Sequence, residues 1–173
     1  IPSIVLDTTK VLGITGGRYV GEAVAVAGSS TWQDYSLELD VKKCSGSYFN
    51  IVFRYVDPGT YYMVESPSDS AHIALWKRVN GTFTQLVFPR PVQPTVLGTW
   101  YHYRIELRTT PDGTNIKVFV DRDEKFDFTD NTTDLSNGSV GVGGHSSESR
   151  FDNVVVQYLY GFKGLLPPYA PPE

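Results

Sequence analysis

An alternation of apolar and polar residues with a period of two recurs along nearly the whole chain and constrains its fold more than any other feature. The clearest example is the segment YSLELDV at residues 35–41, in which the apolar side chains occupy every second position. Successive side chains of a strand point to opposite faces, so this pattern indicates a strand with one buried face. Helical spacing is almost absent, and the sequence therefore predicts an all-β fold.

Nine further segments have the character of strands: 49–55, 61–65, 72–79, 83–88, 101–108, 115–120, 125–128, 140–144 and 151–158. Turn-forming sequences separate several of them, including DPG at residues 57–59, NG at 80–81 and PDG at 111–113. Many short strands with turns between them are typical of a β-sandwich or barrel. Prolines at positions 89, 91 and 94 predict that residues 87–98 form a long surface loop.

Length and composition fit one domain with a sizeable core. The chain has 173 residues and a formal net charge of -4, which gives no basic surface for nucleic acid. No apolar run approaches the roughly 18 residues that cross a membrane, so membrane insertion is not expected. We expect one domain over residues 1–160 and a proline-rich linker over 161–173 that leads to neighbouring domains of a longer chain.

The cellular setting of the protein is indicated by its glycosylation sequences and cannot be read from its cysteine content. One cysteine, Cys44, is present, so no intrachain disulfide can form. Asn-x-Ser/Thr sequences begin at Asn80, Asn131 and Asn137, each within a segment rich in turn residues. These sites predict an extracellular or cell-surface protein.

Eight short motifs follow one another with suitable spacing over about residues 18–158. They are WQDY at 32–35, VFRY at 52–55, YY at 61–62, ALWK at 74–77, TWY at 99–101, IKVFVD at 116–121, GSVG at 138–141 and FDNV at 151–154. In this order they resemble the strands of concanavalin A-like lectin/glucanase jelly rolls of the laminin-G-like and carbohydrate-binding-module type. They are also similar to keto-disaccharide hydrolase-like domains. The resemblance implies an antiparallel jelly-roll β-sandwich with two sheets, a scaffold that carries sugar-binding modules, adhesion domains, glycoside hydrolases and polysaccharide lyases.

A sugar-binding site needs an aromatic platform beside planar hydrogen-bonding groups. Strand alternation predicts that Phe53 and Tyr55 point inward, which would leave Arg54 on the outer, concave face. We expect Arg54, Tyr62 and Trp76 to bind sugar there, with the loop at residues 89–94 as a rim.

Two more charged residues, Glu65 and Arg104, could join the same face. Each assignment has a structural alternative. Trp76 could lie along a solvated sheet without a ligand, and Arg54 could form an ion pair with Glu38, Asp40 or Glu65. Trp32 and Trp100 are expected to anchor the core, and His72, His102 and His145 are expected to be isolated surface or loop residues.

The resemblance also implies a structural calcium ion where the first and last strands meet. Asp152 of the closing FDNV strand would bind Ca²⁺, with Asp7 or Glu22 from the N-terminal segment as partner. The alternative is that Asp152 accepts hydrogen bonds from turn amides.

The case for catalysis is open. Glu38 and Asp40 resemble the start of the E-x-D-x-x-E catalytic strand of one glycosidase family, but Lys43 stands where the acid should be. Tyr62, His72 and Arg54 leave a polysaccharide lyase possible. We therefore expect a noncatalytic carbohydrate-binding module of a larger extracellular protein that degrades polysaccharides or lies at a surface. The alternatives are a glycoside hydrolase or lyase on the same fold, and an adhesion or spacer domain without a sugar site.

Overall fold

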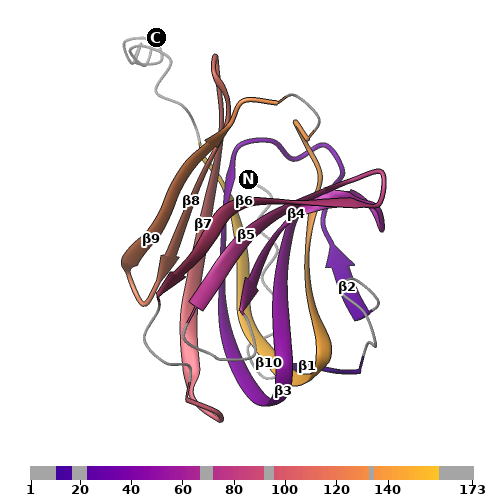
Figure 1. The fold of residues 1–173 in the computed structure, drawn as a ribbon, viewed down its shortest axis with the longest axis vertical. Helices are drawn as coiled ribbons and strands as arrows, with labels where there is room; N and C mark the ends of the chain where they lie inside the picture. Colours follow the sequence, from indigo (N-terminus) through magenta and orange to yellow (C-terminus); the bar gives the residue numbers. More distant parts are fainter. Residues whose placement is uncertain (1–10, 17–22, 67–71, 92–95, 133–134, 160–173) are drawn as a thin grey trace, which may run out of the picture.

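The computed structural model describes residues 11–16, 23–66, 72–91, 96–132 and 135–159. Ten strands make up this part of the chain (Figure 1): β1 (Leu12–Gly16), β2 (Ala23–Ala27), β3 (Tyr35–Asp57), β4 (Thr60–Ser66), β5 (His72–Val79), β6 (Thr82–Pro91), β7 (Trp100–Thr110), β8 (Gly113–Val120), β9 (Asp123–Asp130) and β10 (Ser139–Tyr158). All predicted strands are present, and β1 and β2 are additional. Among the described residues, no helix is long and apolar enough to cross a membrane.

Two strands, β3 and β10, are longer than predicted because each runs through both layers of a sandwich. Residues 49–57 of β3 pair with β4, whereas residues 35–42 pair with β7. The resulting strand order is β6-β5-β4-β3-β7-β8-β9, and β10 pairs with both halves of β3 and with β1 and β2. In Figure 1, β3 and β10 turn back at the lower end of the view. We call the layer with β4, β5, β6 and residues 49–57 of β3 the front sheet, and the layer with β7, β8, β9 and residues 35–42 of β3 the back sheet. The predicted two-sheet antiparallel jelly roll is confirmed.

The turn from one layer into the other has a local cause. Gly46 has a φ of 78° and lies opposite Ser147, and the neighbouring Ser146 has a φ of 46°. A side chain at Gly46 would overlap the backbone carbonyl of Ser146. Glycine therefore allows both long strands to bend at the same place.

The core lies between the inner faces of the two sheets, and it includes Ile51 and Phe53 as predicted. Its most buried residues are exposed by 1% or less and include Phe49, Ile51, Phe53, Val64 and Leu75 from the front sheet and Leu37, Leu39, Ile105, Leu107 and Val118 from the back sheet. Burial of this apolar surface is the main source of stability in a chain without a disulfide.

The two tryptophans expected to anchor the core differ. Trp32 is 5% exposed and packs edge-on against Tyr35, with ring centroids 6.0 Å apart, as predicted. Trp100 is 39% exposed, so the prediction that it anchors the core is wrong. It pairs with Lys42 on the outward side of the back sheet, where the Lys42 Nζ lies 4.6 Å from the centre of its ring.

The predicted loop at residues 87–98 is wrong for its first part, because residues 87–91 belong to β6. This strand ends the order of the front sheet and pairs with β5. A proline lacks an N–H, but at an edge strand no second ladder needs that donor. Residues 92–95, which include Pro94, lie outside the described residues.

Candidate functional site

The structure separates the five residues predicted to bind sugar into three places. Arg54 and Tyr62 point into the core, with exposed fractions of 0%. Glu65 and Trp76 lie on the outer face of the front sheet, and Arg104 lies on the outer face of the back sheet. Glu65 and Trp76 are therefore the predicted residues that meet on one surface.

The prediction that Arg54 projects from the outer face is wrong, and a β-bulge is the reason. Arg54 has a φ of 45°, and the pairing of β3 with β4 slips between Phe53 and Asp57. Against β10, β3 has one extra residue between Val52 and Tyr55. This extra residue reverses the alternation, so Arg54 follows Phe53 into the interior while Tyr55 moves to the outer face.

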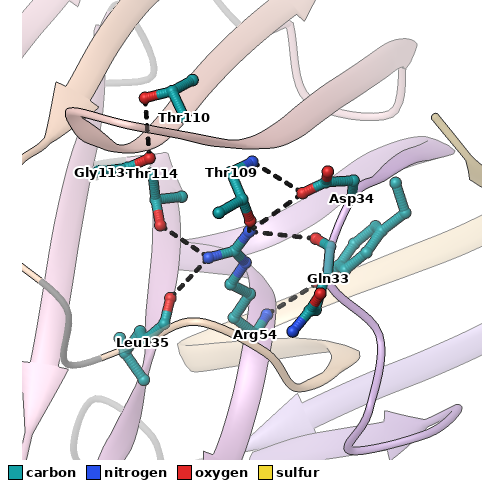
Figure 2. Close-up of polar contacts among 9 residues, drawn as sticks. Gln33, Asp34, Arg54, Thr109, Thr110, Gly113, Thr114 and Leu135 are labelled. Atoms are coloured by element: carbon teal, nitrogen blue, oxygen red, sulfur yellow. Dashed lines mark hydrogen bonds and ion pairs between the residues drawn. The ribbon is translucent and has the colours of Figure 1, made fainter. Parts of the chain in front are cut away.

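Inside the sandwich, the guanidinium of Arg54 is surrounded by oxygen atoms from several parts of the chain (Figure 2). Nη1 donates to Thr114 Oγ1 and to the carbonyl of Leu135 at 2.7 Å each, and Nη2 donates to the carbonyl of Gln33 and to Thr109 Oγ1 at 3.2 Å each. The carboxylate of Asp34 lies 3.8 Å from Nη2. Arg54 thus ties β3 to β7, β8 and the segment before β10, and it is held away from the surface.

Tyr62 belongs to a second buried network, with Lys77 and Asp130. The Tyr62 hydroxyl donates to Asp130 Oδ2 at 2.7 Å, and Lys77 Nζ donates to the same oxygen at 2.9 Å. Burial and the hydrogen bond with Asp130 raise the pKa of the Tyr62 phenol above its ordinary value. Tyr62 is therefore a neutral donor inside the fold, out of reach of a ligand on the outer face.

A groove crosses the outer face of the front sheet between β4, β5 and β6. It is lined by Met63, Glu65, Trp76 and Phe83 and has a volume of about 230 Å³. This is the space of about eight water molecules. Met63 and Trp76 lie directly opposite each other on β4 and β5, so the floor of the groove is set by regular strand pairing.

An aromatic strip extends from the groove along the same face. Trp76 and Phe83 pack edge to face with ring centroids 6.4 Å apart, Phe83 contacts Tyr61 at the same distance, and Tyr61 stacks on Tyr55 at 5.7 Å. The guanidinium of Arg78 lies 4.7 Å from the centre of the Phe83 ring. The strip presents the kind of apolar ring surface on which the C–H face of a sugar can pack.

The side chain of Asn50, beside the groove, lacks a hydrogen-bond partner among the described residues. Asn50 lies opposite Glu65, is fully buried, and has no partner for either Nδ2 or Oδ1. A buried group left unsatisfied costs about 1–3 kcal/mol, so these two atoms mark a place that a buried water would fill.

Glu65 supplies the acidic group of the groove. Its exposed fraction is 9%, and burial raises the pKa of its carboxyl above the ordinary value. The nearby His145 ring and the indole N–H of Trp76 act in the opposite direction, with a smaller effect. A carboxyl in this setting exchanges its proton nearer to neutral pH than a surface glutamate does.

Sequence reasoning missed Asn50 and His145. His145 was expected to be an isolated histidine, but it lies in β10 opposite Tyr48, and the two rings stack with centroids 5.4 Å apart. The strand predicted at residues 140–144 ended one position too early. Asn50 lies on the same outward side of β3 as Val52. The signal that could have revealed it is a single amide side chain within an apolar strand.

Arg104 cannot join Trp76, because β7 belongs to the other sheet. The Arg104 side chain is 44% exposed and forms an ion pair with Glu106. Its Nε lies 3.6 Å from Glu38 Oε1. The side chain is therefore part of a charged network on the back sheet.

A calcium site was predicted from Asp152, Asp7 and Glu22. Of these three residues the structure describes Asp152, because Asp7 and Glu22 lie outside the described part of the chain. Asp152 Oδ1 accepts a hydrogen bond from the Asn153 amide at 2.8 Å. The described residues contain no group of three or more His, Cys, Asp or Glu side chains that could hold a metal ion. Calcium binding stays a prediction.

Comparison with solved structures finds the same fold in several carbohydrate-related proteins. The chain is similar to the carbohydrate binding module CBM66 from Bacillus subtilis, with 18% identity, a TM-score of 0.67, and coverage of 85% of this chain and 94% of that one. It is also similar to the galectin LEC-6 of Caenorhabditis elegans, with 13% identity, a TM-score of 0.58, and coverage of 88% and 99%. The alginate lyase Aly36B is similar at 12% identity and a TM-score of 0.57, with coverage of 86% and 80%. At such identities the likeness shows the fold alone.

No curated protein sequence matches the chain. Residues 17–157, which include every strand from β2 to β9 and nearly all of β10, match a family described as the 3-keto-alpha-glucoside-1,2-lyase-like domain. The resemblance to keto-disaccharide hydrolase-like domains that the motifs predicted is thereby confirmed. The chain belongs to the 3-keto-alpha-glucoside-1,2-lyase-like domain family.

Proposed function

We propose that the domain binds a carbohydrate in the groove of the front sheet and serves as a noncatalytic module of a larger extracellular protein. The observation that carries the proposal is the meeting of an aromatic wall, formed by Trp76 and Phe83, with the carboxyl of Glu65 in one groove. The family, which is named for an activity on a glucoside, and the likeness to a carbohydrate binding module support the same class of ligand.

The groove suits a sugar for a simple chemical reason. A pyranose ring has an apolar C–H face and a rim of hydroxyl groups, and each hydroxyl both donates and accepts hydrogen bonds. The ring would pack on Trp76 and Phe83, while its hydroxyls form hydrogen bonds with the carboxyl of Glu65.

A titration of neutral and acidic oligosaccharides into the purified chain tests this proposal. Trp76→Ala and Glu65→Gln should each weaken binding by at least about tenfold, which corresponds to about 1.4 kcal/mol. Trp100→Ala is the matched control, because Trp100 is an exposed tryptophan on the other sheet, and it should leave this binding within about twofold. If Trp76→Ala and Glu65→Gln bind as well as the parent chain, the groove is not the site. If no oligosaccharide binds, the adhesion or spacer role replaces the proposal.

A second candidate function is favoured by Glu65, whose pKa burial raises, together with the nearby ring of His145, whose charge acts on that carboxyl. In a 3-keto-glucoside the ketone acidifies the proton on C2. A base can remove that proton, the electron pair forms a C1–C2 double bond, and the C1–O bond breaks as an acid protonates the leaving oxygen. Glu65 and His145 could divide the roles of base and acid, which would make the domain a lyase.

Incubation with a 3-keto-glucoside, followed by detection of the released alcohol and the unsaturated ketone, separates the two functions. A lyase should lose about 100-fold or more in kcat in both Glu65→Gln and His145→Asn. Tight binding of the 3-keto-glucoside without product would leave the noncatalytic module as the function.

A further inference from the structure

The outer face of the back sheet carries a second recess, larger than the groove of the front sheet. Its volume is about 590 Å³, and it is lined by Glu38, His102, Arg104, Phe119, Asp121 and Arg122. These residues come from β3, β7, β8 and the turn between β8 and β9. The recess and the groove lie on different sheets of the sandwich and share no lining residue.

The polar groups of the recess are held in place by one another. The two ring nitrogens of His102 lie 2.8 Å from Asp40 Oδ1 and 3.4 Å from Glu38 Oε2. Glu38 also faces Arg104, with 3.6 Å between Oε1 and Nε. The imidazole is nevertheless 41% exposed and the guanidinium 44% exposed, so both are oriented and still reachable.

Phe119 gives the recess an apolar surface within a charged sheet. It lies opposite Arg104 in the pairing of β7 with β8, and the Arg104 Cζ is 5.8 Å from the centre of its ring. An aromatic ring beside a planar guanidinium is the arrangement that suits the mixed apolar and polar surface of a sugar.

The turn that carries Arg122 is strained in a way that a comparable turn in the same chain is not. Asp121 and Arg122 have φ angles of 50° and 76°, and Asn80 and Gly81 of the β5–β6 hairpin have 49° and 84°. Such hairpin turns favour Asn-Gly because both positions are left-handed, so an arginine at the second position is strained where glycine is not.

The strained turn is also fixed to the recess. The amide of Asp121 donates to the carbonyl of His102, and Asp121 Oδ1 accepts from the amide of His102, each at 2.9 Å. The fold therefore keeps Arg122 at the mouth of the recess in a conformation that arginine disfavours.

We infer that this recess is a second carbohydrate-binding site, which takes a neutral sugar. Two guanidinium groups and two carboxylates line it, so donors and acceptors are balanced and match a ligand made of hydroxyl groups. A uronate or a phosphate would meet the carboxylates of Glu38 and Asp121. The sugar ring packs on Phe119, and its hydroxyls accept from Arg104 and Arg122. The inference does not depend on the groove, and the two sites together make the domain bivalent.

Calorimetric titration of the full chain with neutral cello-, xylo-, galacto- and fructo-oligosaccharides, and with an oligouronate for comparison, tests the second site. In Trp76→Ala, where the groove is disabled, binding of a neutral oligosaccharide persists. Adding Arg104→Met and Arg122→Gly to that chain weakens the remaining binding by at least about tenfold. Arg150→Met is the control, because Arg150 of β10 pairs with Lys42 beside the back sheet, is 50% exposed and does not line the recess; it leaves the remaining binding unchanged.

Arg122→Gly supplies a readout that a purely structural arginine would not give. Glycine relieves the strain of the turn, so the melting temperature rises while the affinity for the neutral sugar falls. A rise in melting temperature with unchanged affinity overturns the inference.

The remaining outcomes are equally decisive. If Trp76→Ala alone abolishes all binding, the groove is the sole site in the chain and the second site is overturned while the proposed function stands. Binding that survives the changes at Arg104 and Arg122 also overturns the second site. If the parent chain binds none of these sugars, both the inference and the proposed function fail.

Discussion

At the scale of single residues, Glu65 and Asp130 are buried carboxyl groups whose pKa values shift in opposite directions. Burial raises the pKa of Glu65. Burial also acts to raise the pKa of Asp130, but hydrogen bonds from Lys77 and Tyr62 outweigh it and lower the value. One group therefore weakens the fold as pH rises, and the other weakens it as pH falls.

For Glu65, the folded protein binds the carboxyl proton more tightly than the unfolded chain, whose pKa is 4.5. The free energy of unfolding therefore falls as pH rises from that value through the raised pKa of the folded state. Glu65→Gln should be more stable than the parent chain at about pH 7, and this advantage should vanish at about pH 4. Urea unfolding at several pH values measures the difference, and a gap that stays constant with pH would contradict the prediction.

For Asp130, the contribution to stability is present above the unfolded pKa of 3.8 and is lost as pH falls through the lower pKa of the folded state. Asp130→Asn leaves the ammonium of Lys77, whose side chain is 8% exposed, without its carboxylate. We expect a loss of about 3 kcal/mol at neutral pH that shrinks in acid. Asp127→Asn is the control, since Asp127 pairs with Lys117 at the surface, and it should change the urea midpoint little. Equal midpoints for the two variants would contradict the prediction.

At the scale of elements, the orientation of the β3 side chains could be predicted from the sequence before the bulge but not after it. Ile51 and Phe53 were assigned to the core correctly because the alternation is regular up to that point. The extra residue at Arg54 reverses the faces of the rest of β3, and the segment VFRYVDPG contains no glycine or asparagine at the bulged position to reveal it. Trp76 and Glu65 share one face because the pairing of β4 with β5 is regular from Tyr61 to Glu65.

Gly138, in the segment just before β10, packs directly against the same bulge. Its φ is 151°, its amide donates to the carbonyl of Trp32 at 3.0 Å, and a Cβ on it would overlap the backbone of Arg54. Since backbone atoms cannot move aside as a side chain can, Gly138→Ala should lower the free energy of unfolding by about 2 kcal/mol or more.

Gly13→Ala is the matched control for that change, because no atom lies within 4 Å of a Cβ added at Gly13 in β1. Thermal and urea unfolding of the two variants measure the contrast. Similar stabilities for Gly138→Ala and Gly13→Ala would show that the bulge does not need the glycine.

At the scale of the whole molecule, two outer faces of different character cover one shared core. The front sheet presents the aromatic groove around Trp76, and the back sheet presents the charged recess around Arg104. Both sheets contribute to the same buried cluster, and β3 and β10 pass through both. The front sheet adds a small second cluster on its outer face, formed by Val52, Tyr61 and Met63.

This arrangement predicts a single cooperative unfolding transition. The tryptophan fluorescence, to which buried Trp32 contributes, and the far-ultraviolet circular dichroism of the strands should change with the same midpoint in urea. Separate midpoints would mean that one sheet can persist without the other, and that β3 and β10 do not couple them.

The long pairing of β3 with β10 also has a consequence during protein synthesis. A ribosome releases residues 35–57 well before residues 139–158, and those late residues complete the hydrogen bonding along both halves of β3. Until they emerge, a nascent chain exposes two unpaired edges that can pair with other chains. We therefore expect folding of the domain to wait until β10 has left the ribosome, and a message truncated before β10 to yield an aggregating product that depends on chaperones.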